Sequence, residues 1–517
     1  MKDKFLRGAM ILTIAGLMVK VIGSVNRVLL SRLLGGEGIG LYQMAYPIYL
    51  LLLAVSAAGI PTAISIIVSE LLAKEDYGNV RRVFKVSLRL MACVGLVLAL
   101  MLFGAAGWLV DAGIIQDGRA YYALVALIPA VFFATILASF RGFFQGYQLM
   151  TPTAVSQIIE QFVRVITMVV LAYVLLPYGL EYAAAGAAFG AVPGSLTGLI
   201  VLSFFYRKYS KLWQQTELAP VAAPESTWKL IKRLLALALP VSLANVLVPV
   251  SSSIDMLVVP NRLVACGFKV EEATTLFGYL AGMAQPLLMM ATIPTLSLAA
   301  SLVPAVSEAY TLQDMDTIRR KARTAMKLCC LLTIPAAVGM SAFAEAISLL
   351  LYGTGKAAMA IMHSGPAIWL LGLQQVTTGM LQGMNKTKVP MLHMFYGILA
   401  KLAAVWVLTD AAHNIAGAAW ATNIDFGLIA ILNIYMLSRY GISFNWLELG
   451  RIMLASAMMA AVGILAAGYL KLVLPPVWAN ITVLVFAAAV YVILLPCLNV
   501  VSKEELRQMP VIKRFFK

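Results

Sequence analysis

Apolar residues occupy long, nearly uninterrupted runs along this chain, and short polar or charged segments separate them. A helix needs about 20 predominantly apolar residues to cross a bilayer, so runs of this length predict transmembrane helices. We therefore expect an all-α integral membrane protein with fourteen spans. The predicted spans are residues 9–34, 41–70, 82–109, 120–146, 152–176, 182–206, 229–259, 274–308, 320–350, 358–383, 389–409, 414–438, 448–471 and 477–499.

Composition agrees with this interpretation and excludes an ordinary soluble domain. The 517 residues are 62% hydrophobic and 12% charged, whereas soluble domains are about 45–50% apolar and about 25% charged. The net charge is +16, which alone could indicate a nucleic-acid partner. The basic residues form short clusters between apolar runs, so a cytoplasmic membrane face explains them better, and no nucleic acid is expected. The five cysteines lie mostly within apolar runs and are interpreted as packing residues.

The distribution of Lys and Arg predicts the orientation. With the N-terminus in the cytoplasm, the cytoplasmic segments hold 28 Lys and Arg residues and the outer segments hold six. This asymmetry follows the positive-inside rule and places both termini in the cytoplasm. The first apolar run passes into Lys20 and Arg27 without an obvious cleavage site, so we expect a retained helix rather than a signal peptide.

The two halves of the chain share short sequences in the same order. Ser69-Glu70 matches Ser307-Glu308 at an offset of 238, and Gln145-Gly146 matches Gln382-Gly383 at 237. Such an offset spans six helices, an even number, which indicates a parallel repeat. We expect two six-helix lobes around a central cleft, as in alternating-access transporters. The predicted parts are an N-terminal lobe (1–206), a cytoplasmic linker (207–228), a C-terminal lobe (229–440), two extra helices (441–499) and a basic cytoplasmic tail (500–517).

The first predicted helix carries polar and cationic residues at membrane depth. Lys20, Ser24, Arg27 and Ser31 are spaced four, three and four residues apart, so they share one helical face. No acidic residue lies in this span, and a cleft-facing stripe would bind an anion such as a diphosphate. Alternatively, these cations pair with acids on other helices or reach the interface. The candidate diphosphate contacts are Lys20, Asn26, Arg27 and Arg32.

Other polar residues within the spans either line the cleft or pair with one another. Glu160 and Arg164 are four residues apart and can form an ion pair within their helix, or they contact a substrate or ion. Lys401 is expected to pair with Asn423 and Asp425 of the next helix. The candidate cleft-lining residues are Ser24, Ser31, Gln157, Glu160, Gln161, Arg164, Asn245 and Asp255.

Asp255 has two interpretations: it faces the cations of the first helix, or it caps the outer end of its own helix before Pro260. The sequence shows no phosphate-binding loop, and its three histidines lack metal-ligand spacing. We therefore expect no catalytic residues, no metal site and no enzyme activity.

Several segments resemble the stage V sporulation protein B branch of the multidrug/oligosaccharidyl-lipid/polysaccharide exporter superfamily, which is related to lipid II flippases. The matching segments are Gly23-Ser24-Val25-Asn26-Arg27, Gly59-Ile60-Pro61-Thr62-Ala63-Ile64-Ser65, Arg141-Gly142-Phe143-Phe144-Gln145-Gly146 and Gln157-Ile158-Ile159-Glu160-Gln161-Phe162-Val163-Arg164. Among the lipid II flippases, basic residues of the first helix line the cleft. Lys20 falls at one such position, and the next aligns with Asn26, one residue before Arg27.

The resemblance implies a bacterial cell-membrane flippase for undecaprenyl-diphosphate-linked sugars, with lipid II the leading candidate. It implies membrane lipids as partners, together with cell-wall synthesis proteins, and a lipid-tail groove formed by residues 448–499. No cofactor is expected beyond a coupling ion or the membrane potential.

Three alternatives stay open. A cation-coupled drug exporter would favour acids over cations in its cleft. A membrane-embedded glycan polymerase or acyltransferase would need catalytic acids or a histidine. A scaffold for cell-wall proteins would tolerate neutral residues in the cleft.

Overall fold

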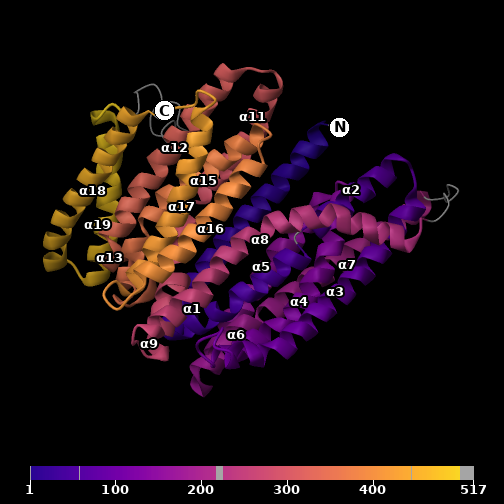
Figure 1. Ribbon diagram of the computed structural model, residues 1–517, viewed down its shortest axis with the longest axis horizontal. Helices are drawn as coiled ribbons and strands as arrows, with labels where there is room; N and C mark the ends of the chain where they lie inside the picture. Colours follow the sequence, from indigo (N-terminus) through magenta and orange to yellow (C-terminus); the bar gives the residue numbers. More distant parts are fainter. Residues whose placement is uncertain (1, 58, 217–224, 444, 501–517) are drawn as a thin grey trace. The chain divides into compact units, whose positions relative to one another are not determined.

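A computed structural model describes residues 2–57, 59–216, 225–443 and 445–500. All regular secondary structure in these ranges is helical, as the sequence predicts (Figure 1). The chain forms two compact units with their boundary between Gly278 and Tyr279. Part of the predicted linker (217–224) and nearly all of the predicted tail (501–517) lie outside the described residues.

The first unit contains the helices up to α9. They are α1 (Lys2–Ser56), α2 (Ile60–Ala73), α3 (Tyr77–Asp111), α4 (Ala120–Gly146), α5 (Met150–Leu175), the 3₁₀ turn η1 (Leu176–Tyr178), α6 (Leu180–Phe189), α7 (Ala191–Thr216), α8 (Thr227–Ala265) and α9 (Val270–Phe277).

A π-helical segment, η2 (Gly278–Ala284), leads into the second unit. The helices that follow are α10 (Gln285–Ala291), α11 (Ile293–Thr311), α12 (Met315–Ala342), α13 (Ala344–Tyr352), α14 (Ala358–Ser364), α15 (Pro366–Gly383), α16 (Lys388–Leu408), α17 (Asn414–Ser438), α18 (Trp446–Val473) and α19 (Pro476–Cys497).

Eleven helical stretches of the described chain are long and apolar enough to cross a membrane, or twelve if the bent pair Val270–Ala291 and Ile293–Thr311 forms one span. The multi-pass helical architecture is confirmed, but the count of fourteen is not. The predicted spans 9–34 and 41–70 both overlap a single stretch, Ile14–Ala73. The predicted span 358–383 is divided between α14 and α15, and neither is among the eleven.

The chain changes direction within α1 at Gly35. Its dihedral angles, φ 67° and ψ −172°, are non-helical and lie in a region that only glycine adopts readily. If the helix were straight, Arg27 and Tyr46 would be about 28 Å apart at 1.5 Å per residue. Instead the Arg27 guanidinium lies against the Tyr46 ring. Gly35 therefore folds α1 back on itself, close to the boundary predicted after residue 34.

Apolar and aromatic side chains fill the interior of the first unit. Phe84 of α3 packs against Phe143 of α4 with ring centroids 4.5 Å apart, and against Tyr206 of α7 at 4.8 Å. Helix α8 packs against α1, α2 and α3, which is why the compact unit extends to Gly278 and includes the predicted span 229–259. The lobe boundaries drawn from sequence stay a prediction.

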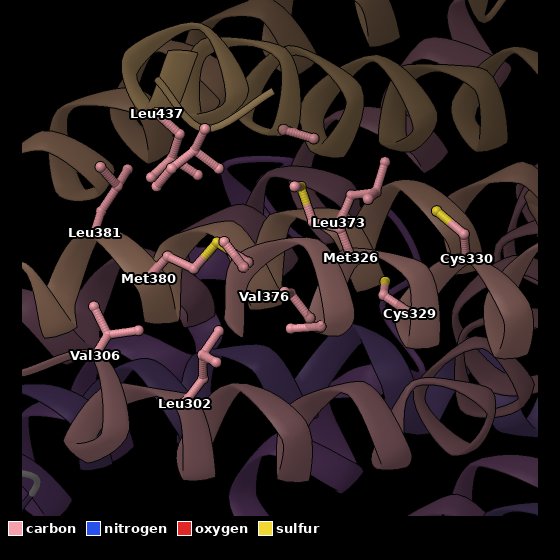
Figure 2. Packing of buried hydrophobic residues seen from close by; sticks show 14 of the residues in the cluster. Leu302, Val306, Met326, Cys329, Cys330, Leu373, Val376, Met380, Leu381 and Leu437 are labelled. Carbon is pink, nitrogen blue, oxygen red and sulfur yellow. The ribbon is translucent and has the colours of Figure 1, made fainter. Parts of the chain in front are cut away.

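The second unit has its own core where α11, α12 and α15 pack together. Figure 2 shows Val306, Met326, Val376 and Met380 converging in this core. Cys329 and Cys330 are buried within it, which confirms the packing role expected for these two cysteines. Helices α18 and α19 pack against each other beside this core (Figure 1).

Large apolar side chains remain exposed on the outside of both units. Leu465 and Leu472 of α18 are 77% and 85% exposed, and Val485 and Ile493 of α19 are also exposed. In water this surface would be unfavourable, but in the hydrocarbon of a bilayer it is the expected exterior of a membrane protein.

Two helix caps match at the predicted repeat offset of 238 residues. Asp76 accepts a hydrogen bond from the Asn79 backbone N–H (3.1 Å) and begins α3. Asp314, 238 residues later, accepts one from the Thr317 N–H (2.9 Å) and begins α12. The residue before each cap has the same positive φ of 57°. The two predicted copies therefore share a local backbone conformation as well as residue types.

Two close helix crossings also match at nearly the same offset. Gly146 of α4 faces Val68 of α2, where an added Cβ would lie 2.6 Å from the valine Cβ. Gly383 of α15 faces Val306 of α11, where an added Cβ would lie 2.8 Å from the valine Cβ. Both glycines allow a close helix crossing that a larger residue would separate.

Candidate functional site

All twelve candidate site residues fall within the first unit. The stripe on α1 runs from exposed to buried: Lys20 is exposed, Ser24 and Arg27 are half-buried, and Ser31 is buried. Arg32 is exposed, next to Ser31. Within the described chain, neither Lys20 nor Arg32 has an ion-pair or hydrogen-bond partner.

Arg27 contacts an aromatic ring rather than an acid. Its Cζ atom lies 5.9 Å from the centroid of the Tyr46 ring, within the range of a cation–π interaction. Tyr46 stacks on Tyr42 (5.2 Å between centroids) and lies 5.7 Å from Tyr49. The Tyr46 ring packs against the guanidinium without neutralising it, and Arg27 has no acidic partner in the described part of the chain.

Asn26 lies on a different side of α1 and is buried. Its Nδ2 atom donates to the Met168 sulfur of α5 at 3.3 Å, and its Oδ1 atom has no donor in the described part of the chain. Gln161 of α5 also faces α1, because its Nε2 atom lies 3.2 Å from where a Cβ of Gly23 would be. Asn26 and Gln161 therefore contribute to the α1–α5 contact.

Glu160 is shared by two arginines. Its Oε1 atom accepts from Arg164 Nη2 at 2.7 Å, which confirms the predicted pairing within α5, and its Oε2 atom accepts from Arg141 Nη2 of α4 at 2.6 Å. All three side chains are largely buried. The triad carries a net positive charge, and the two arginine Nε atoms are buried without an acceptor in the described ranges. It is a second cationic centre beside α1.

Helix α7 supports this triad through glycine. A Cβ atom added at Gly194 would lie 2.9 Å from the Arg164 Cβ, and one added at Gly198 would lie 3.4 Å from the Glu160 Cβ. Gly194 therefore allows a close approach of α7 to Arg164, whereas a Cβ at Gly198 would make an ordinary van der Waals contact.

The remaining candidates are more scattered. Gln157 is half-buried. Asn245 is exposed on α8, and its Nδ2 atom donates to the Val241 carbonyl at 2.9 Å. Asp255, also on α8, is only 2% exposed, and α8 continues past it and past Pro260 to Ala265, so the prediction that Asp255 caps the end of this helix is wrong. Since α8 packs against α1, Asp255 belongs to the same unit as the cationic stripe.

The second unit holds a related arrangement with the acid on another helix. At the repeat offset of 237, Lys401 of α16 corresponds to Arg164, and Gly397 corresponds to Glu160. Lys401 and Asp425 of α17 are both buried. A Cβ at Gly397 would lie 2.5 Å from Asp425 Oδ1, so this carboxylate lies beside the turn that precedes Lys401. This placement agrees with the predicted association of Lys401 and Asp425, whereas Asn423, also predicted to pair with Lys401, donates to the His363 carbonyl at 2.9 Å.

An ion-pair cluster stabilises the end of the first unit that is predicted to face outward. Arg119, just before α4, binds Glu37 of α1 at 2.7 Å and Asp117 at 2.8 Å, and Thr274 of α9 donates to Asp117 at 2.8 Å. Burial of Asp117 would raise its pKa, but the hydrogen bonds from Arg119 and Thr274 outweigh it and hold the pKa below its usual value. The cluster fixes the turn of α1 against α9.

Sequence reasoning did not include Arg141 and Tyr46 among the site residues. Arg141 lies within the predicted span 120–146, but its contact with Glu160 depends on how α4 and α5 pack. The signal for Tyr46 was present, because Tyr42, Tyr46 and Tyr49 are spaced as one helical face.

Comparison with known proteins identifies the family. The model of the polysaccharide biosynthesis protein family matches residues 5–310. The chain belongs to this family. A second model, MatE, matches residues 280–407.

Individual relatives agree with this assignment. The chain is 31% identical to stage V sporulation protein B of Bacillus subtilis (strain 168) over 521 residues, covering 99% of each. It is 27% identical to the lipid II flippase MurJ of the same organism, covering 78% of this chain and 77% of MurJ. A structure of lipid II flippase MurJ in an inward closed conformation matches with a TM-score of 0.71 at 15% identity, covering 94% of this chain and 98% of that one. The fold is therefore that of the MurJ-like transporters.

Proposed function

We propose that this protein is a flippase for an undecaprenyl-diphosphate-linked sugar precursor, lipid II or a related cell-wall or polysaccharide unit, in the bacterial cell membrane. The observation that carries the proposal is the uncompensated positive charge on α1. Lys20 and Arg32 have no acidic partner in the part of the chain that the structure describes, and Arg27 lies on an aromatic ring. Cations are expensive in a membrane-spanning helix, and an anionic substrate accounts for their presence.

A diphosphate suits this site chemically. It offers several oxygen acceptors and more than one negative charge, and Arg and Lys donors bind such groups through charge-assisted hydrogen bonds. The Arg141–Glu160–Arg164 triad adds a net positive charge behind α1. We infer that Lys20 and Arg27 contact the diphosphate directly and that the triad contributes to the positive potential.

The prenyl tail would remain in the lipid. Helices α18 and α19 pack against each other and expose many apolar side chains, which suits contact with a long hydrocarbon. We propose that the tail lies along these two helices while the head group crosses, with both termini in the cytoplasm.

Alternating access between two repeated halves is the proposed mechanism. The matched caps at Asp76 and Asp314 and the matched crossings at Gly146 and Gly383 support an internal repeat of the kind that such transporters use. Outward movement of an anion is favoured by the membrane potential, by about 2.3 kcal/mol per charge per 100 mV. A coupling ion or the potential itself would reset the protein.

The test is the exposure of lipid II to an external probe in cells that depend on this protein. Wild type is compared with Lys20→Ala/Arg27→Ala at matched protein levels. The matched control, Arg207→Ala/Lys208→Ala, removes the same charge from an exposed segment of α7. We expect the precursor to stay inside only in the first variant. Normal exposure of lipid II in the Lys20→Ala/Arg27→Ala variant would show that these two cations are not a substrate site or that lipid II is not the substrate.

The MatE match to residues 280–407 favours a second candidate, a cation-coupled exporter of small molecules. Such a protein would expel cationic dyes from cells, and loss of Lys20 would not prevent this. Dye efflux measured beside lipid II exposure separates the two functions.

A further inference from the structure

The second unit contains a pocket of about 310 Å³ between α12 and the start of α18. Its exposed rim includes Arg323 of α12, together with Ser443 and Asn445 just before α18. Its buried floor includes the apolar side chains of Met326 and Leu449. This volume is at the lower end of the range for small-ligand sites, about 300–1,000 Å³. It accommodates a compact polar group above an apolar base.

The charges of the pocket favour an anion. Lys327 and Glu448 form an ion pair at 3.0 Å on its wall and largely cancel each other. Arg323 has neither an ion-pair nor a hydrogen-bond partner anywhere in the described sequence. The net positive charge of the pocket therefore comes from an arginine whose donors are available.

The beginning of α18 adds to this potential. Asn445 caps the helix by accepting from the Glu448 backbone N–H at 3.4 Å. The first backbone N–H groups of a helix carry partial positive charge and favour phosphate groups. Together with the Ser443 hydroxyl and the Arg323 guanidinium, they give the pocket donors from several directions.

The position of the pocket indicates a membrane lipid as the source of the anion. It lies at the end of α12 that the Lys and Arg distribution assigns to the cytoplasm. Trp446 and Leu447, the first residues of α18, are 74% and 68% exposed beside it. An exposed tryptophan at a helix end is typical of the membrane interface, and basic pockets between helices on this side bind acidic lipid head groups.

We propose that this pocket binds the phosphate group of an anionic phospholipid of the inner leaflet. The apolar side chains of Trp446 and Leu447 would contact the glycerol and the upper acyl chains, while Arg323 binds the phosphate. The site lies in the second unit and does not depend on the diphosphate site of α1.

The experiment is native mass spectrometry of the purified full chain titrated with phosphatidylglycerol or phosphatidylcholine. Arg323→Gln should weaken phosphatidylglycerol binding about tenfold, the effect of losing one charge-assisted contact. The matched control is Arg320→Gln, which removes the same charge from an exposed position of α12 outside the pocket. Glu448→Gln should tighten binding, because it removes a negative charge from the pocket wall.

Three outcomes overturn the proposal. Equal losses in Arg323→Gln and Arg320→Gln would show general attraction to a basic surface. Binding of phosphatidylcholine as tight as that of phosphatidylglycerol would show that the pocket does not distinguish an anionic from a zwitterionic lipid. Binding of inorganic phosphate with the same Arg323 dependence, without binding of phosphatidylglycerol, would assign the pocket to a soluble phosphate compound. If Arg323→Gln unfolds, Arg323→Lys, which keeps the charge but loses the planar donor pair, should weaken lipid binding by a smaller factor than Gln.

Discussion

The guanidinium of Arg27 lies over the ring of Tyr46, although the two residues are on opposite sides of the Gly35 turn. This contact replaces the acidic partner that a membrane-buried arginine usually has. It holds the cation in one orientation and leaves its charge uncompensated. The proposed flippase function depends on this arrangement.

The contact predicts a graded response at Tyr46. Tyr46→Phe keeps the aromatic face and should leave transport near the wild-type rate. Tyr46→Leu removes the cation–π interaction, worth about 0.5–2 kcal/mol, and should slow transport several-fold at matched protein levels. Initial rates of lipid II exposure measure both variants. A Phe variant as impaired as the Leu variant would show that the hydroxyl, rather than the ring, is required.

The triad predicts a large loss of stability when its carboxylate is removed. Glu160→Gln leaves Arg141 and Arg164 buried without a counter-charge, which should cost about 3–5 kcal/mol. The matched control, Glu271→Gln, neutralises an exposed acid of α9 and should have little effect. Thermal unfolding in detergent provides the measurement.

A second variant separates charge from packing at the triad. Glu160→Gln/Arg141→Met removes one of the two unpaired guanidinium groups and should recover part of the lost stability. No recovery would mean that Glu160 acts by its shape rather than by its charge.

The matched helix caps predict similar effects in the two halves. Asp76→Ala and Asp314→Ala should each lower the free energy of unfolding by about 1 kcal/mol. Asn at either position should keep most of the stability that the Ala variant loses, because its side-chain oxygen can also accept the capping hydrogen bond. Denaturant titration of the four variants tests this. If one Ala variant kept the wild-type free energy of unfolding and the other lost much more than about 1 kcal/mol, the two caps would not be equivalent.

Asp117 predicts a pH dependence at low pH. Its folded-state pKa lies below the ordinary value of 3.8 because Arg119 and Thr274 donate hydrogen bonds to it. A depressed carboxyl pKa contributes stability above the unfolded-state pKa, and this contribution is lost as the pH falls through the folded-state value. The contribution of the Asp117 carboxylate to the free energy of unfolding should therefore be constant above about pH 5 and should decrease below about pH 4.

The control for this pH effect is Asp117→Asn, which cannot ionise. It should be less stable than wild type at pH 7, and the difference should shrink as the pH falls below 4. Melting temperatures in detergent across this range measure it. A constant difference at all pH values would show that the Asp117 charge does not stabilise the fold.

Patterns local in sequence predicted much of the structure. Apolar runs located most membrane-spanning helices, and the four-residue spacing of Glu160 and Arg164 predicted their ion pair. These features depend on one helix at a time, so the sequence contains them directly.

Features that depend on packing between helices were not predictable. Arg141 reaches Glu160 only because α4 and α5 are neighbours, and Asn26 is buried only because α5 covers it. The count of fourteen spans was not confirmed because apolar length alone does not show where a helix bends or divides, as at residues 358–383.

The most direct test of the central claim is transfer of purified lipid II across proteoliposomes that contain only this protein, followed with a membrane-impermeant reagent. Wild type and Arg207→Ala/Lys208→Ala should expose lipid II rapidly, and Lys20→Ala/Arg27→Ala should approach protein-free liposomes. Equal transfer by all three proteins would contradict a role for the α1 cations, and no transfer by wild type would contradict a lipid II flippase.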